Sequence, residues 1–414
     1  MKPESLTRQQ DVRLVPLAVS AADFRRHVIF DCCKWDPQVG DTSTISDHAC
    51  LLAPETASHL SRLAESLSRE TLALEQALAQ RPDLFGHLAI PRPLRKLLAQ
   101  PDTASNAVRV MRFDFHPTSD GWALSEVNSD VPGGYAEASM LPRLASAHAV
   151  GAPGGDPAAA LLAAMSRRLV PGARIAFVHA TAYSDDRQVM QFLARAFSAA
   201  GFVCVLAAPD HLRWEQGRPV LVTAGHAGPA DAIIRFYPAE WLSLLQRNTD
   251  WPGYFRARAV MANPPHALLS QSKRLPLVWD ALGLELPAWR SALPETRDPR
   301  DGPWRSNDSW VLKPAMGRVG ESIGWRGSVD TKDWRRMARS ATLFPRHWIA
   351  QRRFDARLVA TRDGPRNLCV GVFTVDGKAA GFYGRLSSRA IIEKHAQDIA
   401  VLVVSQASED RHVA

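Results

Sequence analysis

The chain has 414 residues, 46% of them hydrophobic and 22% charged, a composition typical of a soluble globular protein with two or three lobes around a sizeable core. No apolar run is long enough to span a bilayer, and the first residues lack the apolar centre of a signal peptide, so we expect a cytoplasmic protein with no membrane partner. The net charge of +8 comes from scattered basic residues, which favours phosphates or acidic substrates over nucleic acid as partners. Five cysteines without a Cys-x-x-Cys pair predict neither a zinc site nor a disulfide framework.

Two helical stretches come first in the chain. Residues 21–36 combine a helical start with a short apolar run that ends at Trp35. In residues 60–84 leucines recur at helical spacing, with Arg, Glu and Gln between them, which predicts an amphipathic helix or helical pair with a structural role. A segment punctuated by prolines, 91–102, leads from these helices to the motif that follows.

The strongest motif is VMRFDFHPTSDGWALSEVNSDVPGG, at residues 110–134. Its segments 111–115 and 122–128 alternate apolar and polar residues, as half-buried strands do, and PTSDG between them supplies turn chemistry. The motif therefore predicts a β-hairpin. Its core face is expected to carry the apolar side chains of Met111, Phe113, Phe115, Ala123 and Val127.

The other face of this hairpin carries polar side chains. Side chains two positions apart in a strand share a face, so Arg112 and Asp114 are expected beside Glu126 and Asn128. Two registers, with Asp114 opposite Leu124 or opposite Glu126, both give this arrangement. The residues alone allow two interpretations: a solvated face with a cross-strand ion pair, or a magnesium site, because Mg²⁺ prefers carboxylate and amide oxygens.

Beyond the hairpin, GGYAEA at residues 133–138 is expected to open a helix, whose free N–H groups could meet an anion. The Gly- and Pro-rich residues 149–157 are expected to form a linker. Buried-type strands that alternate with a helix then predict a parallel α/β lobe, which often binds ligands at the carboxyl ends of its strands, here around residues 180–186 and Tyr237. The predicted strands are 174–179, 202–206 and 233–236, and the predicted helix is 185–200.

Two features at the start of this lobe allow two interpretations each. His179 could be a catalytic base, but a histidine at the end of a buried strand is more often structural. Asp185 and Asp186 could select a cationic amine, but an acidic pair at the start of a helix more often caps that helix.

The second strong motif is WVLKPAMGRVGESIGW, at residues 310–325. An apolar strand ends in Lys313 and Pro314, and a loop with three glycines follows. Glycines at this spacing let backbone N–H groups approach phosphate oxygens, while a lysine at the strand end meets them as a point charge. The loop is no Walker loop, because no Gly-Lys-Ser/Thr occurs. A Gly-rich loop alone is weak evidence, and a plain hairpin turn is the alternative.

Three further segments complete the chain. Residues 263–279 predict a helix that carries Lys273, and 348–353 predict a strand whose end could meet an adenine edge. LCVGVFTVDGKAAGFYGRLS, at residues 368–387, predicts a hairpin that turns at Asp-Gly and brings Arg385 back toward the centre. The chain is expected to end in a polar segment, from residue 397, that frays after Val404.

Together these motifs resemble the synthetase part of glutathionylspermidine synthase and its single-domain relatives, a group of ATP-grasp ligases. The resemblance rests on RFDF…EVNSDVPGG, RIAFVHATAYSDD, the segment 263–279, WVLKPAMGRVGESIGW and GVFTVDGKAAGFYGRLS. These blocks lie in the family's order. The Glu-x-Asn block precedes the Lys-Pro strand, whereas many ATP-grasp enzymes have it last. With about a hundred residues before the hairpin, no amino-terminal amidase domain is expected.

The resemblance implies an α/β ATP-grasp fold with a circularly permuted motif order and an inserted parallel α/β lobe. The implied domains are 1–148 with the metal-binding hairpin, 149–262 as a preATP-grasp or substrate lobe, and 263–414 as the nucleotide-binding region. The implied activity is a carbon–nitrogen ligase that joins a small-molecule or peptide carboxylate to an amine through an acyl phosphate. A nucleotide-binding homologue without ligase activity and a phosphotransferase remain alternatives, and the oligomeric state is open.

The matched positions also imply the site, with ATP and Mg²⁺ as cofactors. The implied magnesium ligands are Asp114, Glu126 and Asn128. The implied phosphate contacts are Lys273 and Lys313, with Gly317, Arg318 and Gly320 as a phosphate lid and Gln351 beside the adenine. Arg112 and Arg385 are implied to face the carboxylate or acyl phosphate. The lid reads GRVG where the family tends to have GREG, so its acidic residue is lost or replaced by Glu321.

Overall fold

The computed structural model describes residues 11–100, 106–246, 248–317 and 322–404. It is a mixed α/β structure. In these ranges the strands form one eight-stranded sheet, one four-stranded sheet, two three-stranded sheets and one two-stranded sheet. Every helix in the described part of the chain is too short or too polar to cross a membrane.

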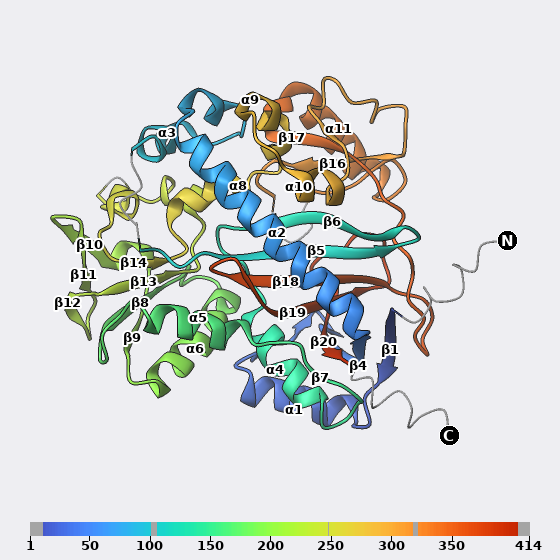
Figure 1. Cartoon of the computed structure of the whole chain (residues 1–414), viewed down its shortest axis with the longest axis horizontal. Coiled ribbons are helices and arrows are strands. Elements are labelled where there is room, and N and C mark those ends of the chain that lie inside the picture. Colours follow the sequence, from blue (N-terminus) through green and yellow to red (C-terminus); the bar gives the residue numbers. More distant parts are fainter. Residues whose placement is uncertain (1–10, 101–105, 247, 318–321, 405–414) are drawn as a thin grey trace.

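The eight-stranded sheet, called the main sheet below, joins segments from both ends of the chain (Figure 1). Its strand order is β1-β4-β20-β19-β18-β5-β6. The short strand β7 pairs with the last two residues of β20. Neighbours run antiparallel except β4 and β20, which are parallel. The bounds are β1 (Val12–Pro16), β4 (Ile45–Leu52), β5 (Val110–Thr118), β6 (Gly121–Asn128), β7 (Ala152–Pro153), β18 (Asn367–Val375), β19 (Lys378–Ser387) and β20 (Gln397–Val403).

The predicted central hairpin is confirmed as β5 and β6. Arg112 pairs with Asn128 and Asp114 pairs with Glu126, which is one of the two expected registers. Because directly paired residues in an antiparallel sheet point to the same side, all four side chains lie on one face.

A bulge then corrects one detail of the prediction. The register shifts after Asp114, and Phe115 pairs with Leu124, so Ser125 is the extra residue of β6. The expectation that Ala123 belongs to the core face is therefore wrong. Leu124 is fully buried in its place, while Ala123 is only half-buried.

The closing hairpin is also confirmed. β18 and β19 are joined by Asp376 and Gly377, both at positive φ (48° and 80°), as a two-residue hairpin turn requires. The expectation of a polar end from residue 397 is wrong, because β20 is a buried strand between β19 and β4. Fraying after Val404 falls on residues outside the described ranges.

The predicted linker at residues 149–157 is corrected as well. Ala152 and Pro153 form β7 on the main sheet, and the glycines after it pack against β19. Gly155, at φ 139°, lies so near that an added Cβ atom would meet the carbonyl oxygen of Ala380 at 2.5 Å. These glycines permit close packing, and they do not make a flexible connection here.

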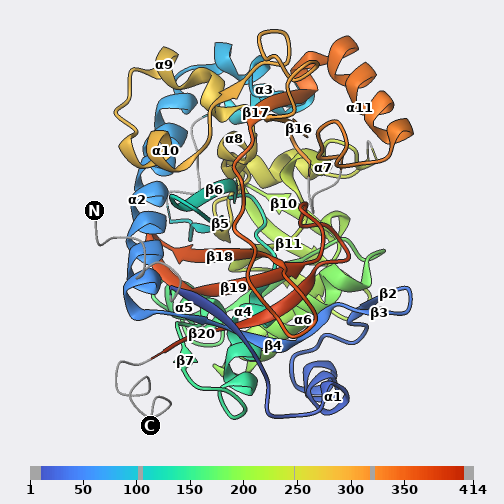
Figure 2. The ribbon, with the colours of Figure 1, turned by 90° about the vertical axis from the view of Figure 1, so that its right-hand side faces the viewer.

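A long helix, α2 (Pro54–Ala79), covers one face of the main sheet, as Figures 1 and 2 show. Its leucines Leu60, Leu67 and Leu74 belong to the same buried cluster as Phe113 and Val372 of the sheet. This confirms the amphipathic helix, which begins six residues earlier than the leucine pattern. On the other face of the sheet, α1 (Ala21–Asp31) and α4 (Tyr135–Ala145) pack near β4 and β20, and α5 (Pro157–Ser166) packs on Phe373 and Val375 of β18. The site lies on the rest of this face.

The predicted parallel lobe is present as a four-stranded sheet in the order β14-β13-β8-β9. Its fourth strand was not expected from the sequence. The bounds are β8 (Arg174–Val178), β9 (Val203–Ala207), β13 (Ala232–Arg235), β14 (Val260–Ala262), α5 (Pro157–Ser166) and α6 (Ser184–Ala199). All four strands lie within 149–262, although the division of the chain into three domains stays a prediction.

The remaining sheet of interest contains the second motif. β16 (Trp310–Pro314) pairs with β17 (Trp348–Arg352), which also pairs with β15 (Thr296–Arg297), and α11 (Thr331–Leu343) packs on these strands. Both predicted strands are confirmed. In Figure 2 this sheet and α11 lie above the main sheet.

The predicted helix at 263–279 is wrong. The segment is broken into short pieces, and Lys273 lies in a turn after α8 (Leu268–Gln271). Its backbone N–H bonds to the carbonyl oxygen of Ala315, which fixes this turn against the end of β16. The other short elements are α3 (Arg92–Leu98), α7 (Ala239–Leu242), α9 (Trp279–Leu282), α10 (Pro287–Ala292), β2 (Gln38–Val39), β3 (Thr42–Ser43), β10 (Leu212–Glu215), β11 (Arg218–Val222) and β12 (Ala227–Pro229).

Candidate active site

A cleft of about 2140 Å³ opens between three parts of the structure. One wall is the exposed face of the main sheet, with Asp114 and Glu126. A second wall is the three-stranded sheet, with Lys313 and Gln351, and a third is the amino-terminal end of α6 with Asp185. A ligand in this cleft therefore contacts segments that are far apart in the sequence.

The main sheet contributes a row of polar side chains that crosses five adjacent strands. The pairings show which side chains share the face, because Asp114 pairs with Gly371, Gly371 with Tyr383, and Cys369 with Arg385. We call the set the polar row: Asn128 and Glu126 on β6, Arg112 and Asp114 on β5, Cys369 and Gly371 on β18, Tyr383 and Arg385 on β19, and Asp398 on β20. All of them except Gly371 line the cleft.

Arg112 and Asp114 form a two-pronged ion pair in the middle of this row. Arg112 Nε and Nη2 donate to the two oxygens of Asp114 at 2.7 and 2.8 Å, and Nη1 donates to the carbonyl oxygen of Gly133 at 2.5 Å. Asn128 Nδ2 also donates to Asp114 Oδ2 at 3.1 Å, which turns its amide oxygen away from that carboxylate. Gly371 leaves room for the pair, since an added Cβ atom would lie 2.8 Å from Asp114 Oδ1.

Two lysines from other segments meet the row at Glu126. Lys273 Nζ lies 2.8 Å from Glu126 Oε2 and also donates to the carbonyl oxygen of Gly317 at 2.8 Å. Lys313 Nζ donates to the carbonyl oxygen of Ser125 at 3.1 Å. The structure therefore brings both predicted phosphate contacts to adjacent residues of β6, Lys273 to the carboxylate of Glu126 and Lys313 to the carbonyl oxygen of Ser125.

The charges around Glu126 shift the pKa values of Glu126 and Lys313. Burial opposes ionisation of Glu126, but Lys273, Lys313 and Arg112 outweigh it and hold the pKa of Glu126 well below its usual range. Burial lowers the pKa of Lys313 to about 8; Glu126 opposes this shift and Lys273 adds to it.

Sequence reasoning missed His116, which lines the cleft beside these groups. Its Nε2 lies 3.1 Å from Ser125 Oγ, and its ring lies 5.2 Å from the ring of Phe354. Burial lowers the pKa of His116 to about 4, with Lys313 adding to the effect, so the ring is neutral at physiological pH. His116 is two residues after Asp114, so the strand period already placed it on the polar face. It was missed because it directly precedes the turn segment PTSDG.

Gln351 is buried at the back of the cleft on β17. Its Nε2 donates to Thr296 Oγ1 at 2.9 Å, and a small cavity of about 30 Å³ joins it to Lys273, Leu293 and Ile349. Its placement beside an adenine stays a prediction.

Arg385 lies two strands away from Arg112 and faces the same cleft. Its Nη2 donates to the carbonyl oxygens of Glu393 and Ala396 at 2.7 and 3.4 Å, and its Nε lies 3.9 Å from Asp398 Oδ1. Between the two arginines stands Tyr383, whose ring centroid is 4.6 Å from the guanidinium carbon of Arg112.

Of the predicted lid, Gly317 is described and touches Lys273 through its carbonyl oxygen. Arg318 and Gly320, and with them Glu321, lie outside the described residues. The lid stays a prediction.

The predicted metal ligands stay a prediction. No cluster of three or more His, Cys, Asp or Glu side chains in the described ranges could hold a metal ion. Asp114, Glu126 and Asn128 supply two carboxylates and one amide on a shared face, and such hard oxygens fit Mg²⁺ when phosphate oxygens complete its shell. The set fits a metal bound together with a nucleotide better than one held by protein alone.

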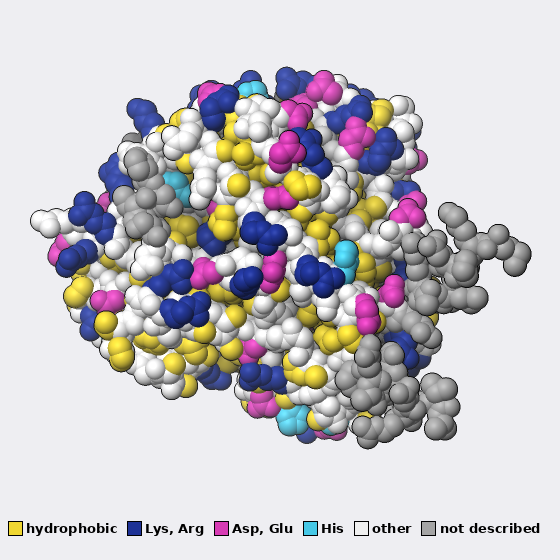
Figure 3. Space-filling view, viewed as in Figure 1, with side chains coloured by type: hydrophobic (Ala, Val, Ile, Leu, Met, Phe, Trp, Pro, Cys, Tyr) yellow, Lys and Arg dark blue, Asp and Glu magenta, His cyan; other side chains and the backbone are white. Residues whose placement is uncertain are grey.

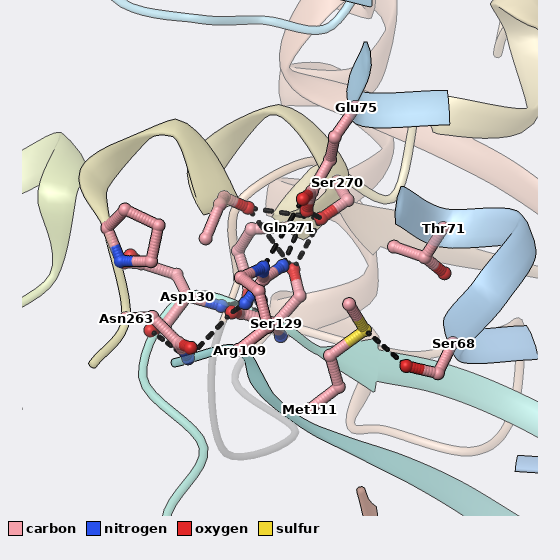
Figure 4. Close-up of polar contacts among 12 residues, drawn as sticks. Ser68, Thr71, Glu75, Arg109, Met111, Ser129, Asp130, Asn263, Ser270 and Gln271 are labelled. Atoms are coloured by element: carbon pink, nitrogen blue, oxygen red, sulfur yellow. Dashed lines mark hydrogen bonds and ion pairs between the residues drawn. The ribbon is translucent and has the colours of Figure 1, made fainter. Parts of the chain in front are cut away.

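A buried polar network holds the Asn128 end of the hairpin in place (Figure 4). Asn263 accepts from the backbone N–H of Val110 at 2.7 Å and donates to the carbonyl oxygen of Ser129 at 3.0 Å, so it ties the two strands together. Arg109 joins Glu75 of α2 at 2.5 Å.

The parallel lobe contributes Tyr183, Asp185 and Asp186 to the cleft, within the expected residues 180–186, and Trp241 of α7 lines it as well. The expected Tyr237 is not among the cleft residues. His179 is not among the cleft residues; its Nδ1 lies 3.3 Å from the carbonyl oxygen of Phe177. On the face shown in Figure 3, Lys and Arg side chains lie in separate groups with Asp and Glu among them.

A family model for the glutathionylspermidine synthase preATP-grasp family matches residues 22–404. The chain belongs to this family. The match confirms the family suggested by the motifs. The predicted fold is confirmed with it, an ATP-grasp fold in which the Glu-x-Asn strand β6 precedes the Lys-Pro strand β16 and the parallel lobe lies between them.

Solved structures that match this chain share little sequence with it. A glutathione synthetase-like effector from Globodera pallida, in its apo form, is 11% identical with a TM-score of 0.59, over 94% of this chain and 99% of that chain. A putative γ-glutamylcysteine synthetase from Methylobacillus flagellatus is 11% identical, with a TM-score of 0.44 over 79% and 88%. A D-alanyl-alanine synthetase A from Vibrio cholerae is 13% identical, with a TM-score of 0.34 over 58% and 77%. No curated protein matches the sequence.

Proposed function

We propose that the protein is an ATP-dependent ligase that joins a carboxylate to an amine through an acyl phosphate. The observation that carries the proposal is the meeting of two lysines at one end of the polar row, where Lys273 pairs with Glu126 and Lys313 bonds to the carbonyl oxygen of Ser125 beside it. The same row presents Arg112 and Arg385 to the cleft. This arrangement supports the proposal, because ammonium groups suit phosphate and guanidinium groups suit a carboxylate, and the chain belongs to an ATP-grasp family.

In this proposal Mg-ATP binds at the hairpin end. Glu126, Asn128 and Asp114 hold Mg²⁺, which when bound neutralises and orients phosphate oxygens. Lys273 and Lys313 contact the phosphates as point charges, and Gln351 lies beside the adenine. The buried setting strengthens each of these contacts, because a charge in a partly desolvated cleft is screened less than one at the surface.

The acid and the amine meet farther along the row. An oxygen of the substrate carboxylate attacks the γ-phosphorus, ADP leaves, and the amine then attacks the acyl carbon with loss of phosphate and one proton. Arg385 and Arg112 hold the carboxylate and face the charge that builds on the phosphoryl oxygens, because a planar guanidinium matches both groups. The acid is a small molecule or a peptide, and glutathione and spermidine are the first pair to test because the family is named for their product.

The test is the release of ADP and phosphate from the full-length protein with panels of peptides and amines. We expect turnover that needs both an acid and an amine, and transfer of ¹⁸O from a labelled carboxylate into the released phosphate. Binding of ATP without turnover across the panels would contradict the proposal in favour of a nucleotide-binding homologue. A stable phosphorylated product without the amine would identify a phosphotransferase instead.

A further inference from the structure

Lys34 is a buried ammonium ion held by two carboxylates at the far end of the cleft. Its Nζ donates to Glu137 Oε1 at 2.5 Å and to Asp398 Oδ2 at 2.7 Å. The exposed fractions of the three side chains are 19%, 12% and 8%, so this is no solvated surface pair. Burial by itself lowers the pKa of Lys34, but the two carboxylates outweigh it and raise that pKa well above its usual range.

The segment that carries Lys34 is held on both sides. Helix α1 ends at Asp31, and Cys33 adopts a positive φ of 58°, which redirects the chain toward the main sheet. The next residue, Trp35, donates its backbone N–H to Gln188 Oε1 of α6 at 2.7 Å. The lysine therefore enters its pocket from a fixed backbone, between the main sheet and the parallel lobe.

The same carboxylates connect Lys34 to the proposed catalytic arginines. Asp398 uses Oδ2 for Lys34, and it accepts the hydroxyl of Tyr383 on Oδ1 at 2.7 Å. The ring of Tyr383 in turn supports the guanidinium of Arg112 at 4.6 Å. Arg385 Nε stays 3.9 Å from Asp398 Oδ1, beyond hydrogen-bond distance, while its Nη2 donates to the carbonyl oxygens of Glu393 and Ala396.

We propose that Lys34 is a positioning residue, an internal ammonium that pairs with Glu137 and Asp398, cancels one of their two charges, and so keeps Arg385 off Asp398 and Tyr383 in place against Arg112. Without it, two buried carboxylates face the nearest guanidinium, and Arg385 is drawn onto Asp398. The pocket that Lys34 fills is then an empty ammonium site, which takes a small primary alkylammonium ion. The link to turnover rests on the proposed function, whereas the pocket does not.

The test uses Lys34→Ala in the full-length protein, with n-propylammonium as the probe, because it replaces the atoms from Cγ to Nζ. We expect kcat to fall by about tenfold to a hundredfold with Mg-ATP affinity nearly unchanged, since the arginines are displaced and the nucleotide end is not. Millimolar n-propylammonium should restore most of the rate. It should also raise the Tm of Lys34→Ala, and tetramethylammonium at the same concentration should not, because it has no N–H to donate.

A matched control is Lys378→Ala, whose lysine lies 3.7 Å from Glu65 but is 80% exposed. Neither its rate nor its Tm should respond to n-propylammonium.

Lys34→Met keeps the apolar stem, so it replaces Lys34→Ala if the smaller side chain prevents folding, with loss of kcat as its readout. Unchanged kcat in the folded variant, or loss without any response to the probe, would overturn the proposal. If the unmodified protein shows no turnover, the proposed function fails, and the Tm response alone decides whether the ammonium pocket exists.

Discussion

The two ends of the polar row differ in the balance of their charges. At the hairpin end two lysines lie near the single carboxylate of Glu126: Lys273 pairs with it, and Lys313 bonds to the neighbouring carbonyl oxygen of Ser125. Burial lowers the pKa of Lys313 to about 8. At the other end a single lysine, Lys34, lies between Glu137 and Asp398, and its pKa rises. A site with a surplus of cations is suited to receive an anion, whereas a lysine that is already held by two carboxylates offers no charge to a ligand. The neutral pair of Arg112 and Asp114 separates the two.

The largest loss of turnover is expected from a substitution of Glu126, at the hairpin end. We expect Glu126→Ala to abolish turnover, by at least about 10²–10³-fold, because Lys273 loses its partner and the metal loses a ligand. ADP release at modest magnesium measures the loss, and circular dichroism checks that the fold is kept. The control is Asp120→Ala, on the exposed turn of the same hairpin, which should leave turnover unchanged. Near-normal turnover in Glu126→Ala would refute the metal assignment.

Between the two ends, Arg385→Lys should separate catalysis from nucleotide binding. Lysine cannot copy the planar fork of a guanidinium, so we expect a loss of about 10²-fold in kcat. Calorimetric titration with Mg-ATP should give an affinity close to that of the unmodified protein, because we propose that the nucleotide binds at the other end of the row. Arg362→Lys, 60% exposed and outside the cleft residues, serves as the control. Weakened nucleotide binding in Arg385→Lys would contradict the assignment.

Removing one of the surplus cations should weaken nucleotide binding directly. Lys313→Met deletes a charge-assisted contact, worth about 1.5–3 kcal/mol, so the Kd for Mg-ATP should rise by about tenfold to a hundredfold. The same substitution at the exposed Lys332 of α11 should leave the Kd unchanged. If Lys313→Met binds Mg-ATP as well as the unmodified protein does, the phosphates lie elsewhere in the cleft.

The smallest effect follows from the pKa of Lys313. Below pH 8 Lys313 is already protonated in the free protein, so it can bind phosphate without taking up a proton. Above about pH 8 binding must first take up a proton, so the Kd for Mg-ATP should rise with pH, by up to about tenfold per pH unit. Lys313→Arg remains charged, and its Kd should stay flat between pH 7 and 9.5. A flat profile for the unmodified protein would show that Lys313 does not meet the nucleotide as a cation.

The sequence by itself determined which face of the hairpin is polar and which residues share it. The period of two in a strand places Asp114 and Glu126 together whatever the rest of the chain does, and Asp-Gly at 376–377 dictates a tight turn. The family motifs added Lys273 and Lys313 as candidates. None of this depends on contacts between distant segments.

Only the tertiary structure decided what each of these side chains touches. Lys34 meets Asp398 across 364 positions of the chain, and no local pattern contains such a pairing. The strand β20 looked like a polar tail and the glycines at 154–155 like a linker, because burial by distant neighbours is absent from the residues themselves. Likewise, one bulged residue, Ser125, exchanged Ala123 for Leu124 in the core. Periodicity assigns a face to a side chain, whereas its partner and its charge state depend on the packing of segments that meet only in the folded protein.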